Sequence, residues 1–92
     1  MRRAAFASAW AGVVKIPLNR IMVGEYGQAN PPAGMDVLTL MSLVAYFRKT
    51  GGPCDPPIKV TIEGDYWRVD DGRHRYFAAV IAGRQEIEAE VV

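Results

Sequence analysis

The sequence predicts a small α/β (α+β) domain, in which a helix covers a mixed sheet and one strand passes through a glycine turn into a second helix. Three observations lead to this expectation. Apolar residues recur at three- and four-residue spacing over 35–49, as on one face of a helix. Apolar and polar residues alternate over 58–63 and 87–91, as in strands with one buried face. A glycine and three basic residues stand at 72–75, directly after an aromatic-rich segment.

The composition is that of one small domain without a strongly charged surface. Half of the 92 residues are hydrophobic and the formal net charge is +1, which argues against both a disordered chain and a basic nucleic-acid coat. Any site for an anion must therefore be local. Cys54 is the one cysteine, so the chain forms no internal disulfide, and we expect a reducing, cytoplasmic location.

The chain divides into a lead-in at 1–12 and a domain at 13–92. Arg2 and Arg3 precede a run of small residues, which is similar to a signal peptide but lacks the apolar segment that export requires. We therefore expect a flexible or weakly helical lead-in. No segment approaches the length of a membrane span.

The first half of the domain is expected to contain a strand, a long loop and the main helix. Alternating apolar residues predict the strand at 13–18. Three glycines and two prolines predict a loop at 24–34, and long loops on small domains are often functional. The helix at 35–49 has Asp36 in its first turn, where the dipole favours an acid, and Gly51 follows its end.

The second half is expected to contain a hairpin, a helix and a last strand. A Glu-Gly-Asp turn joins a strand at 58–63 to its partner at 66–69. The second helix is expected at 73–82, with Gly83 as its C-terminal cap. In the last strand, at 87–91, apolar residues alternate with acids, which predicts one buried face and one acidic face. The acidic residues are Glu86, Glu88 and Glu90.

The turn at 70–76 is the candidate functional site. The free N–H groups of a helix's first turn and the helix dipole favour an anion there. Arg73 and Arg75 place positive charge at the positive end of this dipole, which is unfavourable unless an anion compensates it. We expect that anion to be a phosphate group. The competing interpretation is that the arginines form salt bridges with Asp70, Asp71 or a glutamate of the last strand.

Other residues at or near this turn also have two interpretations. His74 either packs and caps or contacts the ligand, and the lack of a second histidine or a cysteine cluster argues against a zinc site. Asp71 is either the N-cap of the helix or a carboxylate that binds magnesium or acts as a general base. Glu25 is the second candidate base and is otherwise a solvated loop residue. Cys54 is expected to have no functional role.

Three blocks of the sequence resemble the ParB/sulfiredoxin superfamily, over roughly residues 14–92. They are SLVAYF (Ser42 to Phe47), PPIKV (Pro56 to Val60) and GRHRYFAA (Gly72 to Ala79). In sulfiredoxin the corresponding blocks build an ATP site around a Gly-Cys-His-Arg-Tyr turn. The turn of ParB reads Gly-Glu-Arg-Arg and holds the triphosphate of CTP. Free-serine kinases of the same fold carry Asp-Gly-His-Thr-Arg, which is similar to the DGRHR of this chain.

The resemblance implies a nucleotide site at the same turn. His74 and Arg75 would contact the phosphates, Gly72 would let the backbone approach them, and Arg73 would add positive charge. Ser42 would line the pocket from the first helix. All of these positions except Arg73 match the family pattern.

Departures from the pattern limit what the resemblance implies about activity. The reactive cysteine of sulfiredoxin is replaced by Arg73, so its thiol chemistry is not expected, and Cys54 lies too far along the chain to be assumed as a substitute. The lysine three residues before the serine is replaced by Thr39, which removes one phosphate contact. ParB proteins carry a helix-turn-helix domain after this one, and this chain ends at Val92, so we expect no sequence-specific DNA binding of that type.

We expect a stand-alone ParB-like domain that binds a nucleotide (CTP, ATP or ADP, with or without magnesium) and acts through a protein partner. Isolated domains of this kind resemble those of phages and mobile elements. The second hypothesis is a small ATP-dependent kinase or nucleotidase with Asp71 or Glu25 as base. The third is a nucleic-acid-binding protein or ParB-like nuclease, against which the balanced charge argues. No membrane partner is expected.

Overall fold

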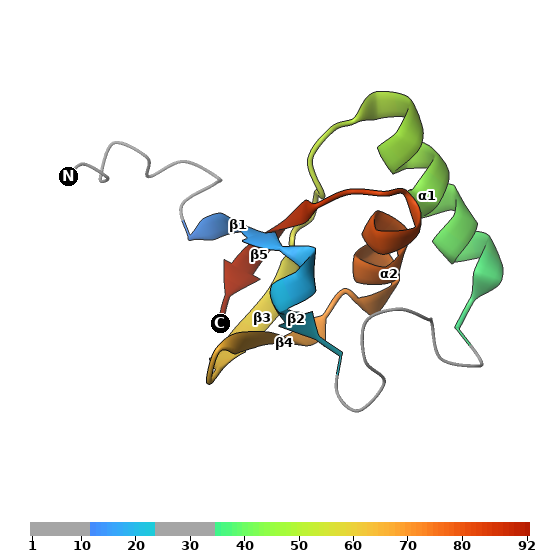
Figure 1. Ribbon diagram of the computed structural model, residues 1–92. Helices are drawn as coiled ribbons and strands as arrows, with labels where there is room; N and C mark the ends of the chain where they lie inside the picture. The colour runs from blue at the N-terminus through green and yellow to red at the C-terminus, as the bar shows by residue number, and fades with distance from the viewer. Residues whose placement is uncertain (1–11, 24–34) are drawn as a thin grey trace.

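The computed structural model describes residues 12–23 and 35–92, and in these residues a five-stranded sheet lies beside two α-helices (Figure 1). The predicted loop at 24–34, with Glu25, and nearly all of the lead-in lie outside the described residues. The elements are β1 (Val13–Pro17), the 3-10 turn η2 (Leu18–Arg20), β2 (Ile21–Met22), α1 (Val37–Thr50), β3 (Ile58–Glu63), β4 (Tyr66–Asp71), α2 (Arg73–Ile81) and β5 (Glu86–Val91).

The sheet is mixed, as predicted, and its strand order is β1-β5-β3-β4-β2. β1 pairs with β5 and β3 with β4 in antiparallel fashion, whereas β3 and β5, like β2 and β4, are parallel. Ile16 lies opposite Ile87, and Val60 lies opposite Val69. All four side chains are buried, so the register brings the apolar face of each of these strands into one core.

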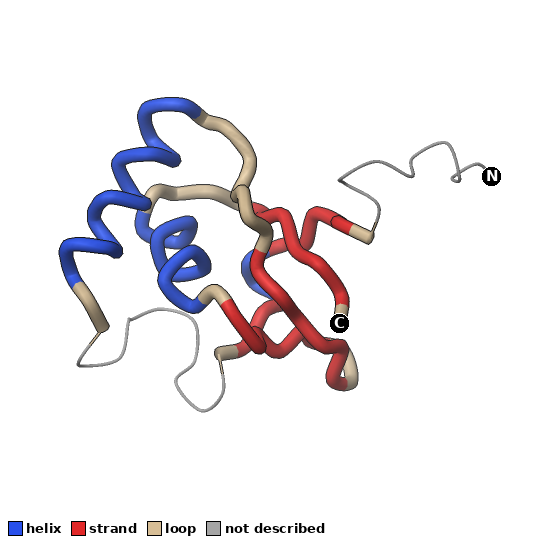
Figure 2. Tube along the Cα trace, turned by 180° about the vertical axis from the view of Figure 1, so that it is seen from behind, coloured by secondary structure: helices blue, strands red, loops and turns tan. Residues whose placement is uncertain are grey.

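The two helices lie on one side of the sheet, and α2 is the inner one (Figure 2). α2 packs against β3, β5 and α1, whereas α1 packs mainly against α2. Four consecutive residues of α2 are fully buried: Tyr76, Phe77, Ala78 and Ala79. A helix that is apolar on every side belongs between two layers, which explains the burial of this short segment. Neither helix in the described ranges is long and apolar enough to cross a membrane.

The ends of α1 follow from residues at its two termini. Asp36 is the N-cap rather than a first-turn residue, and its carboxylate accepts hydrogen bonds from Leu38 N (3.1 Å) and Thr39 Oγ1. At the other end Gly51 adopts a φ of 63°, and its N–H donates to Phe47 O at 3.0 Å. These two contacts place the helix within two residues of the predicted range.

Three expectations about burial are wrong. The alternation over 58–63 predicts that Ile62 lies on the buried face of its strand. Ile62 is instead 60% exposed, because the hairpin tip extends past the helices. On α1, Leu40, Val44 and Phe47 are buried, whereas the neighbouring apolar residues Val37 and Leu38 are exposed. The acidic face of the last strand is also not uniformly exposed, because Glu88 is only 6% exposed. β5 is an interior strand of the sheet, and the segment after α1 covers this carboxylate.

Candidate functional site

The turn between β4 and α2 depends on Gly72. This residue is the N-cap of α2 and has a φ of 105°, a conformation that side-chain-bearing residues rarely adopt. A Cβ built at Gly72 would lie 2.8 Å from Ile58 Cγ2 on the neighbouring strand. The Tyr76 N–H donates to Gly72 O at 2.9 Å and so closes the first helical turn. The glycine thus allows α2 to begin directly against β3.

The N-cap expectation for Asp71 is wrong. Asp71 is the last residue of β4, and the N-cap is Gly72, which provides no side-chain acceptor for the first turn. The first turn of α2 contains no acidic residue, so the positive end of its dipole is not neutralised from within the helix. The side chain of Asp71 is instead 69% exposed, and its Oδ2 lies 3.8 Å from Arg75 Nη2.

His74 and Arg75 each contain a buried polar atom that has no hydrogen-bond partner among the described residues. These atoms are His74 Nε2 and Arg75 Nε. A buried polar atom without a partner is costly, and native proteins rarely leave one so. The ion pair of Arg75 with Asp71 contributes little, because it is long and the Asp71 side chain is largely exposed. The ion pair agrees in part with the salt-bridge interpretation, but it leaves Arg75 Nε without a hydrogen-bond partner.

The first turns of both helices lie at the same end of the molecule, the lower end in Figure 1. The pKa of Asp36 is lowered, mainly by the hydrogen bond from Thr39, while the charge of His74 makes a smaller contribution in the same direction. Thr39, which stands where sulfiredoxin has its lysine, is engaged in capping α1.

A cavity of about 280 Å³ adjoins Arg75. It is lined by Leu43, Tyr46, Phe47, Cys54, Asp55 and Arg75. The fold therefore brings Cys54, distant in the sequence, to the same cavity as Arg75. The thiol is 1% exposed, and burial is the main cause that raises the pKa of Cys54 to about 11. Such a thiol is protonated at neutral pH and is a poor nucleophile.

The candidate residues fall into three groups in the structure. Gly72, Arg73, His74 and Arg75 are together at the start of α2, with Asp71 beside them. Ser42 lies on the exposed side of α1 and does not line the cavity, and Glu25 lies outside the described residues. Within 12–23 and 35–92, the structure contains no group of three or more His, Cys, Asp or Glu side chains placed to hold a metal ion.

The residues that sequence reasoning missed are those of the cavity wall. The sequence assigns no role to Tyr46 or to Asp55. Tyr46 donates through its hydroxyl to Pro53 O at 2.9 Å, which holds the segment before Asp55 against α1. No local sequence pattern predicts this contact, because it depends on how the linker after α1 folds back over the helix.

No protein-family model matches this chain, and no curated protein matches it. Among solved structures, it is similar to the C-terminally truncated chromosome-partitioning protein ParB from Caulobacter crescentus complexed with CTP-γ-S. The TM-score is 0.68 at 20% identity, over 88% of this chain and 44% of that chain. The same protein complexed to the centromeric parS site gives a TM-score of 0.67 at 21% identity.

Sulfiredoxin from Arabidopsis thaliana is similar to the same degree. Its TM-score is 0.66 at 23% identity, over 87% of this chain and 83% of that chain. The chain thus spans most of sulfiredoxin but less than half of the ParB chains that it matches. Identities this low concern the fold alone, and at that level the expectation from the three sequence blocks is confirmed. The mixed sheet and its two helices have the fold that ParB and sulfiredoxin share.

Proposed function

We propose that this chain binds the phosphate groups of a nucleotide at the N-terminus of α2. The observation that carries the proposal is the pair of buried polar atoms, His74 Nε2 and Arg75 Nε, which have no partner among the described residues. A bound phosphate would supply oxygen acceptors for the N–H groups at Arg75 Nε and His74 Nε2. It would also supply the negative charge that the start of α2 lacks.

The neighbouring side chains suit this role. Arg75 has a planar guanidinium whose donors match phosphate oxygens, and Arg73 adds a second positive charge in the same turn. Gly72 carries no side chain that would block approach to the backbone. The adjoining cavity, with Tyr46 and Phe47 on its wall, offers apolar surface for a base or sugar. A triphosphate is a reasonable first probe, since the ParB neighbour was crystallised with CTP-γ-S.

The test is a calorimetric titration of the purified chain with CTP, ATP, ADP and GTP, with and without magnesium. We expect one nucleotide to saturate the protein, and Arg75→Ala to weaken that binding at least about tenfold, because a charge-assisted contact is lost. Arg20→Ala is the matched control. It removes the same charge at the opposite end of β4, where Arg20 Nη1 donates to Asp65 O.

Unchanged affinity in a folded Arg75→Ala variant would contradict the proposal, as would the lack of binding by every nucleotide. Equal losses in Arg75→Ala and Arg20→Ala would show that only the net charge matters. Thermal unfolding of each variant shows whether it is folded, so loss of binding is separated from loss of structure.

A kinase or nucleotidase is the second candidate. It rests on the exposed carboxylate of Asp71, 3.8 Å from Arg75 and beside the proposed phosphates, where it is open to magnesium or to a proton from an acceptor. Phosphate release in the titrated samples, lost in Asp71→Asn, would favour this candidate. Saturable binding without turnover favours a binding module that acts through a partner.

A further inference from the structure

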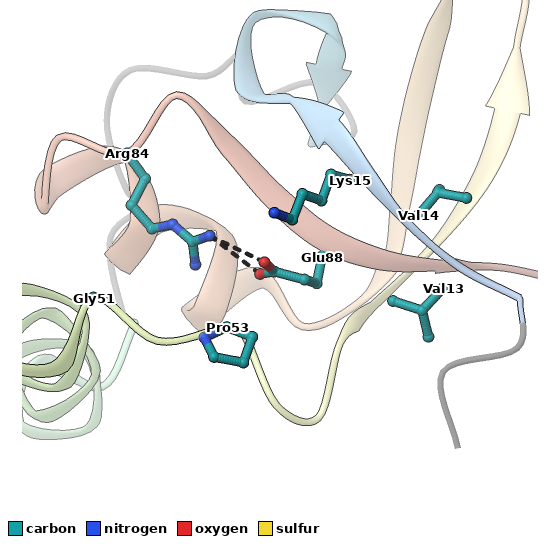
Figure 3. A pocket seen from close by; sticks show the side chains of 7 residues that line it. All are labelled: Val13, Val14, Lys15, Gly51, Pro53, Arg84 and Glu88. Carbon is teal, nitrogen blue, oxygen red and sulfur yellow. Dashed lines mark hydrogen bonds and ion pairs between the residues drawn. The ribbon is translucent and has the colours of Figure 1, made fainter. Parts of the chain in front are cut away.

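A second pocket lies away from the start of α2, at the edge of the sheet formed by β1 (Figure 3). Its volume is about 500 Å³, within the usual range for small-molecule sites. Its lining comes from three parts of the chain, which are β1, the residues after α1, and the region from the end of α2 into β5. Val13, Val14 and Pro53 are apolar, whereas Lys15, Arg84 and Glu88 are charged. None of these residues belongs to the turn proposed to bind phosphate.

The charges of Arg84, which is partly buried, and Glu88, which is buried, are held in one arrangement by hydrogen bonds. Arg84 Nη2 lies 3.2 Å from both carboxylate oxygens of Glu88, and the Cys54 N–H donates to Glu88 Oε1 at 2.7 Å. The guanidinium of Arg84 also lies 5.1 Å from the centre of the Phe47 ring. Burial acts to raise the pKa of Glu88, but these hydrogen bonds outweigh it and keep the carboxyl ionised. The positive charge of Arg84 is therefore matched by Glu88.

Lys15 adds a second positive charge to the lining of this pocket. Its side chain projects from β1 toward Arg84 and Glu88, as Figure 3 shows. Its backbone belongs to the β1–β5 ladder, but within the described ranges the Lys15 ammonium group takes part in no hydrogen bond or ion pair. Two cations and one carboxylate line the pocket, which leaves one positive charge beside an apolar wall.

We propose that this pocket binds a small organic acid. Its carboxylate lies between Lys15 and Arg84, whose guanidinium has five N–H donors, more than its contacts with Glu88 and Gly52 require. Its short apolar body lies against Val13 and Pro53. A neutral ligand would form no ion pair with Lys15, and a polyanion would bring more negative charge than two cations and one carboxylate balance.

The test is a ¹H–¹⁵N NMR titration of the full chain, without nucleotide, with acetate, butanoate, 4-methylpentanoate and benzoate. We expect saturable shifts of backbone amides around Lys15 and Glu88, with affinity rising as the apolar part grows. Lys15→Gln should weaken the tightest of these acids by about tenfold, because one charge-assisted contact is lost. Lys59→Gln, which changes an exposed lysine that does not line the pocket, should leave the affinity unchanged.

Three results would overturn the proposal. They are the absence of saturable shifts with all four acids, equal binding of 4-methylpentanamide and 4-methylpentanoate, and equal affinities for the wild type and Lys15→Gln. Lys15 is exposed on an edge strand, so its variant is expected to fold, and its spectrum shows directly whether it does. The outcome is independent of nucleotide binding, which concerns the other end of α2.

Discussion

Gly72 occupies a position that no other residue type fills without displacing β3. Its φ of 105° is strained for any side chain, and the nearest atom to an added Cβ would be Ile58 Cγ2 at 2.8 Å. Ile58 is completely buried at the centre of the sheet, so it has no room to yield. From the sequence, Gly72 was predicted to lie in the turn, where the lack of a side chain would let a ligand approach the backbone. The structure gives it a further reason, the close packing of the helix start on a strand.

Gly72→Ala should lower the free energy of unfolding by about 2 to 3 kcal/mol, since it combines an unfavourable backbone conformation with a steric overlap. Gly64→Ala is the control, because Gly64 also has a positive φ, of 65°, but open space around it. That change should cost only about 1 kcal/mol. Urea unfolding measures both values. Equal costs would show that packing against Ile58 contributes nothing.

His74 and Arg75 could be identified from the sequence as site candidates, because a helix start with two arginines is unfavourable without an anion. Their partnerless nitrogens could not, since the burial of Nε2 and Nε depends on tertiary packing and not on the local sequence. The N-cap assignment of Asp71 failed for a local reason. The glycine beside it adopts the positive φ that begins the helix one residue later.

At the scale of elements, local chemistry determines where helices and strands begin and end. Asp36 and Gly51 determine where α1 begins and ends, through contacts within four residues of each. Such contacts can be predicted from the sequence. β2 was missed because two residues are too few to show alternation, and its pairing with β4 brings together segments 46 residues apart in the register Ile21↔Trp67. The burial of Glu88 was missed for a similar reason. Alternation shows which residues share a face, not what covers that face.

Glu88 gives β5 a stability that depends on pH. Its folded-state pKa is below the ordinary value, because the hydrogen bonds from Cys54 and Arg84 outweigh the opposing effect of burial. A lowered folded-state pKa contributes stability above the unfolded-state pKa, and this contribution is lost as the pH falls through the folded-state pKa. Glu88→Gln should therefore cost about 2 kcal/mol at pH 7, and its difference from the wild type should shrink in acid.

Urea unfolding between pH 7 and pH 3 measures this dependence. Glu86→Gln is the control on the same strand, because Glu86 is exposed and should cost less than about 0.5 kcal/mol at every pH. A difference between Glu88→Gln and the wild type that stayed constant down to pH 3 would show that the ionised carboxyl of Glu88 does not stabilise the fold.

For the whole molecule, the sequence predicted the class of fold and the composition of the sheet but not the strand order. The three sequence blocks implied the ParB/sulfiredoxin arrangement, whereas periodicity alone could not have placed β5 between β1 and β3. The order matters for function. It places the end of β4 and the start of α2 on one side of the linker after α1, and the Arg84–Glu88 pair at the edge near β1.

The measurement that tests the central claim most directly is a ¹H–¹⁵N NMR titration with the nucleotide that calorimetry finds to bind best. We expect the largest shifts in the backbone amides of Arg73, His74 and Arg75 and in the ring of His74. Weaker shifts should follow along the cavity at Tyr46 and Cys54. If the amides around Lys15 and Arg84 shift instead while those of Arg73 to Arg75 stay in place, the phosphate site is not at the start of α2.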